Sequence, residues 1–383
     1  MRERPQDCDD RPSRLPGGGQ LRARAWRKAL PAVGAFALLA SCGRPLAVSL
    51  CPEALSLRPL VEAAATKAIG QGKVAVVVEG PIGARANVIR VTTTPGWNLA
   101  PGLGPAVVLP SDWDPAYSAP QVLSALGRAK DGSWSSVPIL YDVWGQTTFA
   151  GKGAMPPPPG EWRDLLKRAE PESLSVAGGR PSFRQAAFLF ELFPDVPAAK
   201  EAASWFNQGP DRWEAPGAVL PALVKDRSWP HDAWSFTRND QIAWYKQGKR
   251  LVFLETYRDY ESIDPPGVRR FVPLVAAKEG AGHSMAGEVL FMEYRGRAAD
   301  LARALKLMRV LAGDEFQKQA GMTGKWLAAS RTAPEIDGIG AAARNRVAGA
   351  ARFFPVADGL PDPLVEGSVW TDVQLAVERA PKR

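Results

Sequence analysis

Short apolar runs alternate along this chain with segments of helical spacing, and this alternation limits the folds that it can adopt. Leu46–Leu50, Lys73–Glu79 and Val137–Tyr141 have the length and the apolar content of buried strands. Residues 60–68 instead repeat apolar side chains on one face of a helix. Strands that are apolar on both faces and separated by helices are typical of α/β folds with largely parallel sheets. We therefore predict an α/β protein.

The same alternation continues into the C-terminal half of the chain. We expect further strands at Gly104–Leu109, Arg250–Leu254, Phe271–Ala276 and Val289–Met292, and a helix with an apolar stripe at residues 301–311. A single hydrophobic core stops growing at about 250–300 residues, and this chain has 383. Two domains are therefore the expectation.

The N-terminal segment has the layout of a secretory signal peptide. Basic residues at positions 22–28 precede an apolar run, Ala29–Leu39, which at about eleven residues is too short to span a bilayer of roughly 30 Å. The small residues that follow lead into Cys42, so the segment resembles a bacterial lipoprotein signal. This resemblance implies that residues 1–41 are removed and that Cys42 is acylated as the membrane anchor. An ordinary secretory signal with a chance cysteine is the alternative.

Charge and cysteine usage restrict the partners of the exported part. The chain has 48 Lys and Arg and 40 Asp and Glu, and half of the formal charge of +8 belongs to the leader. The remaining basic residues are scattered, which argues against nucleic-acid binding. Of Cys8, Cys42 and Cys51, only Cys51 would remain as a free thiol, and we expect it to be buried without a disulfide.

Several segments, in order, resemble the extracellular solute-binding proteins of the maltose-binding type, which are the receptors of ABC importers. They are Gly104–Leu109, Val137–Asp142, Pro157–Leu166, Ala243–Tyr257 and Glu315–Trp326. The resemblance implies a two-lobed, type II periplasmic-binding-protein-like fold, with mostly parallel sheets flanked by helices and a hinge between the lobes. It places residues 42–139 plus 275–318 in lobe 1 and residues 140–274 plus 319–383 in lobe 2.

In such a fold the ligand lies in the cleft between the lobes, which close around it by a hinge motion. A sugar needs aromatic rings for its apolar faces and carboxylates or amides for its hydroxyls, since an unpaired polar group in a closed cleft costs about 1–3 kcal/mol. The candidate ligand contacts are Asp112, Trp113, Asp142, Trp144, Trp234, Glu255, Tyr257 and Trp326. Packing within a lobe is the alternative for each aromatic, and a solvated loop end is the alternative for each acid.

We thus expect a monomeric, extracytoplasmic lipoprotein, in the periplasm or on the cell surface, that captures a carbohydrate and delivers it to ABC permease subunits. A binding-fold lipoprotein without a transport role is one alternative, and an exported hydrolase is another. The two histidines and the absence of familiar catalytic motifs argue against an enzyme. Carboxylate pairs such as Asp259 with Glu261 or Asp142 keep glycoside cleavage open. No cofactor and no metal are expected.

Overall fold

The computed structural model separates residues 1–45 from a unit that spans residues 46–383, and all the residues that it describes belong to the second unit. These residues are 46–79, 87–93, 106–116, 119–129, 131–149, 161–162, 164–165, 174–176, 179–192, 237–247, 252–262, 269–278, 282–334 and 337–358. The predicted leader, Cys42 and Trp234 lie outside the described residues. So do residues 369–377, for which the sequence also predicts a helix.

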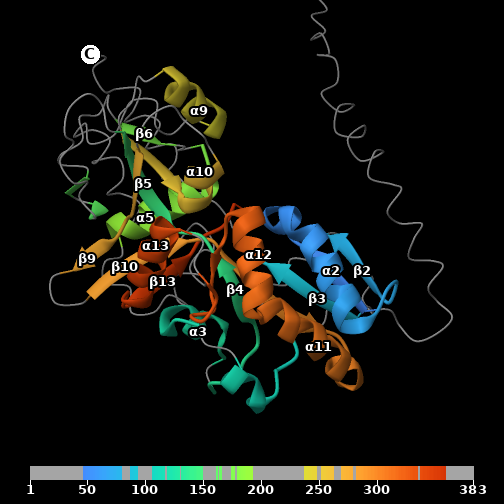
Figure 1. Cartoon of the computed structure of the whole chain (residues 1–383). Helices are drawn as coiled ribbons and strands as arrows, with labels where there is room; N and C mark the ends of the chain where they lie inside the picture. Colours follow the sequence, from blue (N-terminus) through green and yellow to red (C-terminus); the bar gives the residue numbers. More distant parts are fainter. Residues whose placement is uncertain are drawn as a thin grey trace, which may run out of the picture. The chain divides into compact units, whose positions relative to one another are not determined.

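The largest sheet has six strands in the order β12-β4-β11-β3-β1-β2. Figure 1 labels β2, β3 and β4 of this sheet. Its members are β1 (Leu46–Leu50), β2 (Val74–Val78), β3 (Asn87–Thr92), β4 (Val137–Tyr141), β11 (Val289–Arg295) and β12 (Leu327–Ala328). Strand β1 pairs in parallel with β2 and β3, whereas β11 pairs antiparallel with both β3 and β4. Strands β1 to β4 therefore all run in one direction, and β11 is inserted between β3 and β4 from far along the chain.

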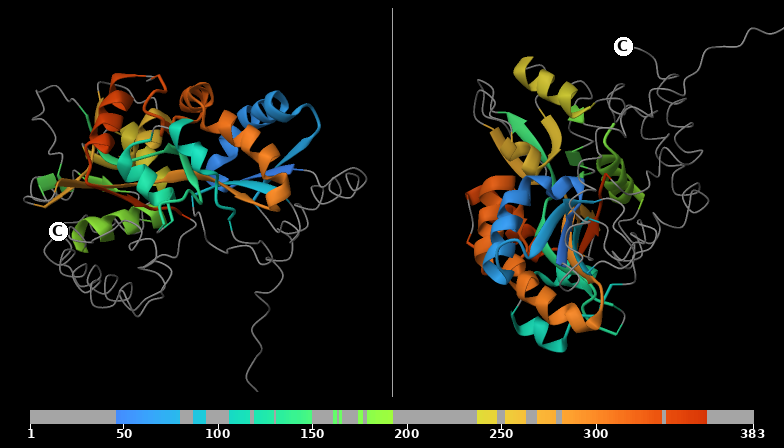
Figure 2. Two further views of the ribbon diagram at one scale, coloured as in Figure 1. Left: turned by 90° about the horizontal axis from the view of Figure 1, so that it is seen from below. Right: turned by 90° about the vertical axis from the view of Figure 1, so that its right-hand side faces the viewer.

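Helices cover one face of this sheet (Figure 2). They include α2 (Arg58–Ile69), α11 (Leu301–Ala312) and α12 (Asp314–Gly324), with the 3-10 helices η3 (Pro52–Leu57), η4 (Ser111–Ala116) and η7 (Ala298–Asp300) in the connections. The apolar side of α11 is buried through Leu307, Met308 and Leu311, which join Ile89 and Val91 of β3 in one hydrophobic core. Apolar side chains recur on one side of both elements, so this core follows directly from the sequence pattern.

The other side of the same strands carries buried ionic side chains. Arg90 of β3 donates from Nη1 to Glu293 Oε1 at 2.5 Å, and Arg295 Nε lies 2.8 Å from the same oxygen. All three side chains are buried. Because alternate residues of a strand point to opposite faces, the positions between the apolar residues of β3 and β11 hold these charges.

Two smaller sheets follow. A four-stranded sheet has the order β6-β7-β5-β8, and a three-stranded sheet has the order β13-β10-β9. Their strands are β5 (Trp144–Phe149), β6 (Leu174–Val176), β7 (Val252–Thr256), β8 (Arg269–Pro273), β9 (Ala276–Lys278), β10 (Gly282–Gly287) and β13 (Arg352–Pro355). The remaining helices are α3 (Gln121–Gly127), α5 (Pro181–Leu192), α9 (Arg238–Gln247), α10 (Tyr257–Ser262) and α13 (Gly338–Ala348).

Short segments connect the sheets, and two of these segments touch each other. The chain leaves β4 at Tyr141 and enters β5 at Trp144, and it passes from β10 to β11 through Glu288. The backbone N–H of Asp142 donates to the carbonyl oxygen of Glu288 at 2.7 Å. A Cβ atom at Gly287 would lie 1.9 Å from the carbonyl oxygen of Asp142, so only glycine permits this approach. Asp142 and Glu288 are thereby held side by side.

The predicted α/β fold class is confirmed, as are the strands at Leu46–Leu50 and Val137–Tyr141. The strand expected at Gly104–Leu109 is wrong for the described residues 106–109. There the N–H of Val107 donates to Tyr294 and that of Leu109 donates to Trp134, which is too scattered a pairing for a ladder.

The strand expected at Phe271–Ala276 is divided. Strand β8 ends at Pro273, which has no N–H, and β9 begins at Ala276. Cys51 is buried and free as predicted, and burial raises the pKa of its thiol. Among the described helices, none combines the length and the hydropathy that a membrane span requires.

The lobe boundaries, residues 42–139 plus 275–318 and residues 140–274 plus 319–383, stay a prediction. Strand β12 lies in the range assigned to lobe 2, but it pairs antiparallel with β4 of the six-stranded sheet.

Candidate functional site

Three guanidinium groups and five carboxylates meet where the three sheets are connected. We call this set the arginine–carboxylate cluster, and its members are Arg180, Arg238, Arg258, Asp142, Glu255, Asp259, Glu288 and Asp358. They come from the end of β4, from β7, from α9 and α10, from the β10–β11 connection, and from the segments before α5 and after β13. Segments far apart in the sequence therefore converge on one group of charges.

Arg180 binds three of the carboxylates. Its Nη1 lies 2.7 Å from Asp259 Oδ2, its Nη2 lies 2.7 Å from Glu288 Oε1, and its Nε lies 3.2 Å from Asp358 Oδ2. Burial lowers the pKa of Arg180, but the three carboxylates outweigh burial and the net shift is upward. The guanidinium therefore keeps its charge and joins α5, α10 and the end of β13 through charge-assisted hydrogen bonds.

Glu288 and Asp142 are both completely buried. Burial raises the pKa of Glu288 to about 7, although Arg180 and Arg258 both lower it. Burial also raises the pKa of Asp142 to about 6, against the opposing effect of Arg258. Desolvation penalises the charged form of a carboxylate, and five carboxylates share three guanidinium groups here. Near neutral pH this pair of acids is therefore close to taking up a proton.

Two backbone N–H groups and the Thr256 hydroxyl form hydrogen bonds with the Asp142 carboxylate. Oδ1 accepts from the backbone N–H of Val143 at 2.8 Å and from that of Arg258 at 3.1 Å. Oδ2 is buried and has no hydrogen-bond partner among the described residues. A buried carboxylate oxygen without a donor is costly, so Oδ2 is an acceptor that a hydroxyl group could satisfy.

Arg238 and Asp259 complete the cluster on its other side. Arg238 Nη1 donates to Glu255 Oε2 at 3.0 Å, and Arg238 Nε lies 3.5 Å from Asp259 Oδ1. Burial raises the pKa of Asp259, but Arg180, Arg238 and Arg258 together hold it below its ordinary value. Within the described ranges, no three His, Cys, Asp or Glu side chains are arranged to hold a metal ion.

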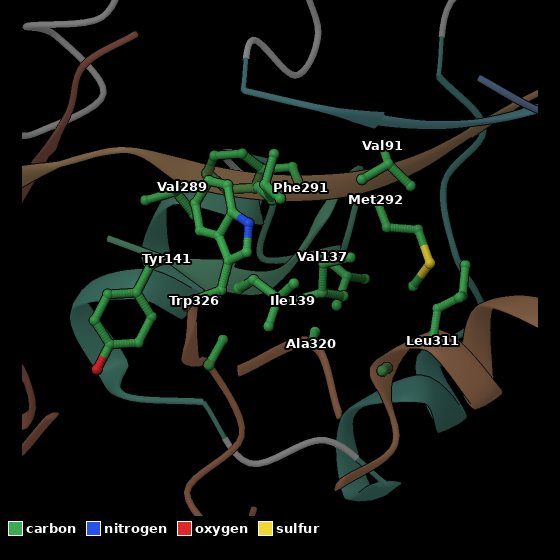
Figure 3. Packing of buried hydrophobic residues seen from close by; sticks show 14 of the residues in the cluster. Val91, Val137, Ile139, Tyr141, Val289, Phe291, Met292, Leu311, Ala320 and Trp326 are labelled. Carbon is green, nitrogen blue, oxygen red and sulfur yellow. The ribbon is translucent and has the colours of Figure 1, made fainter. Parts of the chain in front are cut away.

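Aromatic rings lie against the same guanidinium groups. The Arg258 guanidinium carbon is 3.8 Å from the ring centroid of Trp326, and that of Arg180 is 5.5 Å from the centroid of Trp144. Both distances are typical of cation–π contacts. The indole nitrogens of Trp144 and Trp326 are buried without a hydrogen-bond partner among the described residues. Trp326 also belongs to the apolar core, as Figure 3 shows.

Five of the predicted ligand contacts lie in or beside the cluster. Asp142 and Glu255 are members of it, Trp144 and Trp326 face its guanidinium groups, and Tyr257 precedes Arg258. The hydroxyl of Tyr257 donates to Asp337 Oδ2 at 2.8 Å, and burial together with Asp337 raises its pKa. All five are at most 2% exposed. Their role as ligand contacts stays a prediction.

The other predicted contacts lie elsewhere or outside the described residues. Asp112 is exposed and lies 3.3 Å from Arg309 Nη2 on α11. Trp113 is buried in the hydrophobic core. Trp234 is among the residues that the structure does not describe.

Sequence reasoning missed five members of the cluster: Arg180, Arg238, Arg258, Glu288 and Asp358. Arg258 directly follows the predicted Tyr257, and Glu288 interrupts an apolar run between two strands. A charge inside a buried run is a signal that could have identified Glu288. Arg180 and Asp358 could not have been identified from their neighbours in the sequence, because their ion-pair partners are distant in the chain. Asp259, considered as half of a catalytic carboxylate pair, is instead engaged by Arg180 and Arg238.

Solved structures match most of this chain, although no protein-family model and no curated protein matches its sequence. A family 1 extracellular solute-binding protein from Bifidobacterium longum subsp. infantis has a TM-score of 0.60 at 12% identity, covering 88% of this chain and 95% of that one. The chain has the fold of the family 1 extracellular solute-binding proteins. The predicted resemblance is therefore confirmed at the level of the fold.

Two further structures with the solute-binding-protein fold match to a similar extent. A sugar transporter from Bacillus licheniformis, in complex with stachyose, has a TM-score of 0.56 at 14% identity and covers 87% of this chain and 94% of that one. A probable secreted solute-binding lipoprotein from Streptomyces coelicolor has a TM-score of 0.60 at 14% identity, with 88% and 98% covered. These neighbours are described as solute-binding or transport proteins and not as enzymes.

Proposed function

We propose that this protein is an extracytoplasmic receptor that binds a small carbohydrate and delivers it to the permease of an ABC importer. The observation that carries the proposal is the solute-binding-protein fold with acids and indole rings gathered at its sheet connections. The stachyose complex of a protein with the same fold supports a sugar as ligand. The predicted leader supports export, with Cys42 as the proposed lipid anchor and a monomer as the proposed state.

The proposed lobes are residues 42–139 with 275–318 and residues 140–274 with 319–383. Closure of one lobe on the other requires a hinge, and connecting strands supply hinges in such folds. Here the Asp142–Val143 segment and Glu288 connect the sheets. A sugar that stacked on Trp144 or Trp326 would replace Arg180 or Arg258 on the ring, and its hydroxyls would donate to carboxylates such as Asp142.

Thermal shift measurements with a ligand panel test this proposal. A ligand that binds only the folded state at a concentration of 100 Kd stabilises it by about 2.7 kcal/mol. We expect the melting temperature to rise with one group of sugars, and we expect Asp142→Asn to abolish that rise. Asp131→Asn is the matched control, because Asp131 is exposed and its Oδ1 accepts only from Ser133.

A negative result with the whole ligand panel would contradict a receptor function. If sugars, polyols, amino acids and oligopeptides all leave the melting temperature unchanged, the proposal fails. If a sugar acts equally on the wild type and on Asp142→Asn, binding occurs but the candidate site is wrong.

A binding-fold lipoprotein without a transport role is the second candidate. The observation that favours it is the internal pairing of the cluster, because Arg180 and Arg258 already occupy the ring faces that a sugar would need. The position of the gene discriminates between the two. A permease gene beside this one supports import, whereas an isolated gene supports a surface or scaffold role.

A further inference from the structure

One edge of the six-stranded sheet is tied closely to the proposed anchor. Leu46, the first residue of β1, pairs with Val74 of β2 and with Asn87 of β3, so these three strands begin at the same edge. Three residues separate Cys42 from Leu46 in the sequence. Even fully extended, a chain of this length reaches only about 14 Å. A lipid on Cys42 would therefore hold this edge close to the bilayer.

Basic side chains gather along the same edge. Lys67 lies in the last turn of α2, and Lys73 immediately precedes β2. The last residue of β11, Arg295, pairs with Val88 near the start of β3, which shows that β11 ends at this edge. Arg297, two residues later, therefore lies there too. We call Lys67, Lys73, Arg297 and Arg303 the basic rim.

Contacts between these segments show that they are neighbours. Arg303, at the start of α11, donates from Nη2 to the carbonyl oxygen of Lys73 at 2.7 Å. One acid, Asp300, lies next to the rim: its Oδ2 is 2.7 Å from Arg297 Nη2 and accepts from Asn87 Nδ2 at 2.8 Å. Lys67, Lys73 and Arg297 are exposed. The four rim residues together with Asp300 carry an excess of positive charge toward solvent.

We infer that the basic rim is the surface that the anchored protein places against an anionic membrane. This inference rests on the proposed acylation of Cys42. The potential of an anionic bilayer falls off over about 10 Å at ordinary ionic strength, so a tether that is less than fully extended brings the rim within its range. Exposed lysine and arginine near such a surface contribute to binding additively. The rim therefore restricts how the tethered protein rotates on its anchor.

This orientation has a consequence for the candidate site. Strand β4 runs in the same direction as β1, and Asp142 follows its C-terminal end. Asp142 therefore lies at the opposite edge of the sheet from the basic rim. With the rim against lipid, the arginine–carboxylate cluster faces the aqueous side.

The orientation is tested by the quenching of a fluorophore, attached at one chosen position of the protein, by nitroxide groups on the surface of lipid vesicles. The exported, processed chain is purified from membranes and its mass is measured, which reports acylation independently. It is then reconstituted into vesicles of mixed phosphatidylglycerol and phosphatidylcholine that carry nitroxide headgroups. A fluorophore is attached to Gln71→Cys, next to the rim, or to Glu53→Cys, just beyond the other end of β1. Cys51 is buried and should not react.

We expect strong quenching at position 71 and weak quenching at position 53. Triple reversal of the rim (Lys67→Glu, Lys73→Glu and Arg297→Glu) should reduce quenching at position 71 to the level of position 53. The same change of charge at Arg58, Arg309 and Arg331 is the matched control and should leave the difference intact. Phosphatidylcholine vesicles, or salt at about 0.5 M, should also abolish the difference. Equal quenching of the wild type at both positions overturns the inference.

If the mass shows no acyl group, the anchor proposal fails separately and the surface is still testable. The soluble exported chain is then sedimented with phosphatidylglycerol vesicles at low salt. The rim reversal should weaken its affinity by about a hundred-fold or more, and the control reversal should have a much smaller effect. Equal losses in the two variants overturn the inference.

Discussion

At the scale of single residues, Glu288 predicts how stability depends on pH. Burial raises its pKa to about 7 in the folded protein, against 4.5 for an exposed glutamate. A raised pKa means that the folded state holds the proton more tightly, so its contribution is present at low pH and is lost as the pH rises through 7. Glu288 alone should therefore favour folding by up to about 3 kcal/mol more at pH 5 than at pH 8.

The variant Glu288→Gln tests this prediction, because a glutamine resembles the protonated acid at every pH. We expect its melting temperature to change less than that of the wild type between about pH 5.5 and pH 8. Glu315→Gln, on the exposed side of α12, is the control and should retain the dependence of the wild type. Equal pH profiles for Glu288→Gln and the wild type would contradict the raised pKa.

At the scale of elements, the contact between the two sheet connections depends on Gly287 at the end of β10. A methyl group there would lie 1.9 Å from the backbone oxygen of Asp142, which cannot move without shifting β4 or β5. We expect Gly287→Ala to lower the free energy of unfolding by roughly 2–4 kcal/mol, as overpacking against a backbone atom does. Denaturant unfolding measures this loss.

Gly338→Ala, at the start of α13, is the matched control. A Cβ atom at Gly338 meets no neighbour within 4 Å, so stability should be unchanged or slightly raised. A Gly287→Ala protein as stable as this control would show that the two connections are not tightly held together.

At the scale of the whole molecule, the N-terminal segment predicts where the protein resides. Cys42→Ser should abolish acylation and release the exported protein into the soluble fraction, because a serine cannot carry the thioether lipid. Fractionation of cells combined with labelling by a radioactive fatty acid measures both effects. Cys51→Ser is the control, since Cys51 is buried in the folded unit, and it should remain with the membrane. An equal distribution of the Cys42→Ser protein and the wild type would refute the anchor.

The sequence pattern predicted elements better than it predicted contacts. Leu46–Leu50 and Val137–Tyr141 were predicted with their observed bounds, because each is a short apolar run buried within the sheet. Gly104–Leu109 has a similar pattern, but the hydrogen bonds of residues 106–109 go to two separate segments and no ladder forms. Apolar content shows that a segment is buried, whereas a strand also needs a neighbouring strand in register.

The candidate site shows the same limit. Glu255 and Tyr257 were predicted as ligand contacts because they lie in Ala243–Tyr257, a segment that resembles a known family. Arg180 and Glu288 were missed because they are 108 positions apart and acquire meaning only through their ion pair. The aromatic candidates were predicted to have ring faces free to stack on a sugar. In the structure, guanidinium groups lie over the rings of Trp144 and Trp326.

The order of apolar and polar residues alone was enough to determine the α/β class and four strands of the central sheet, β1, β2, β4 and β11, but not β3 or β12. Hydrophobic burial acts along short stretches of chain, so its period is visible in the sequence. The tertiary structure alone decided which charges share the space between the sheets and which acids hold a raised pKa. Desolvation and ion pairing depend on distances of a few ångströms between residues far apart in the chain, and only folding sets those distances.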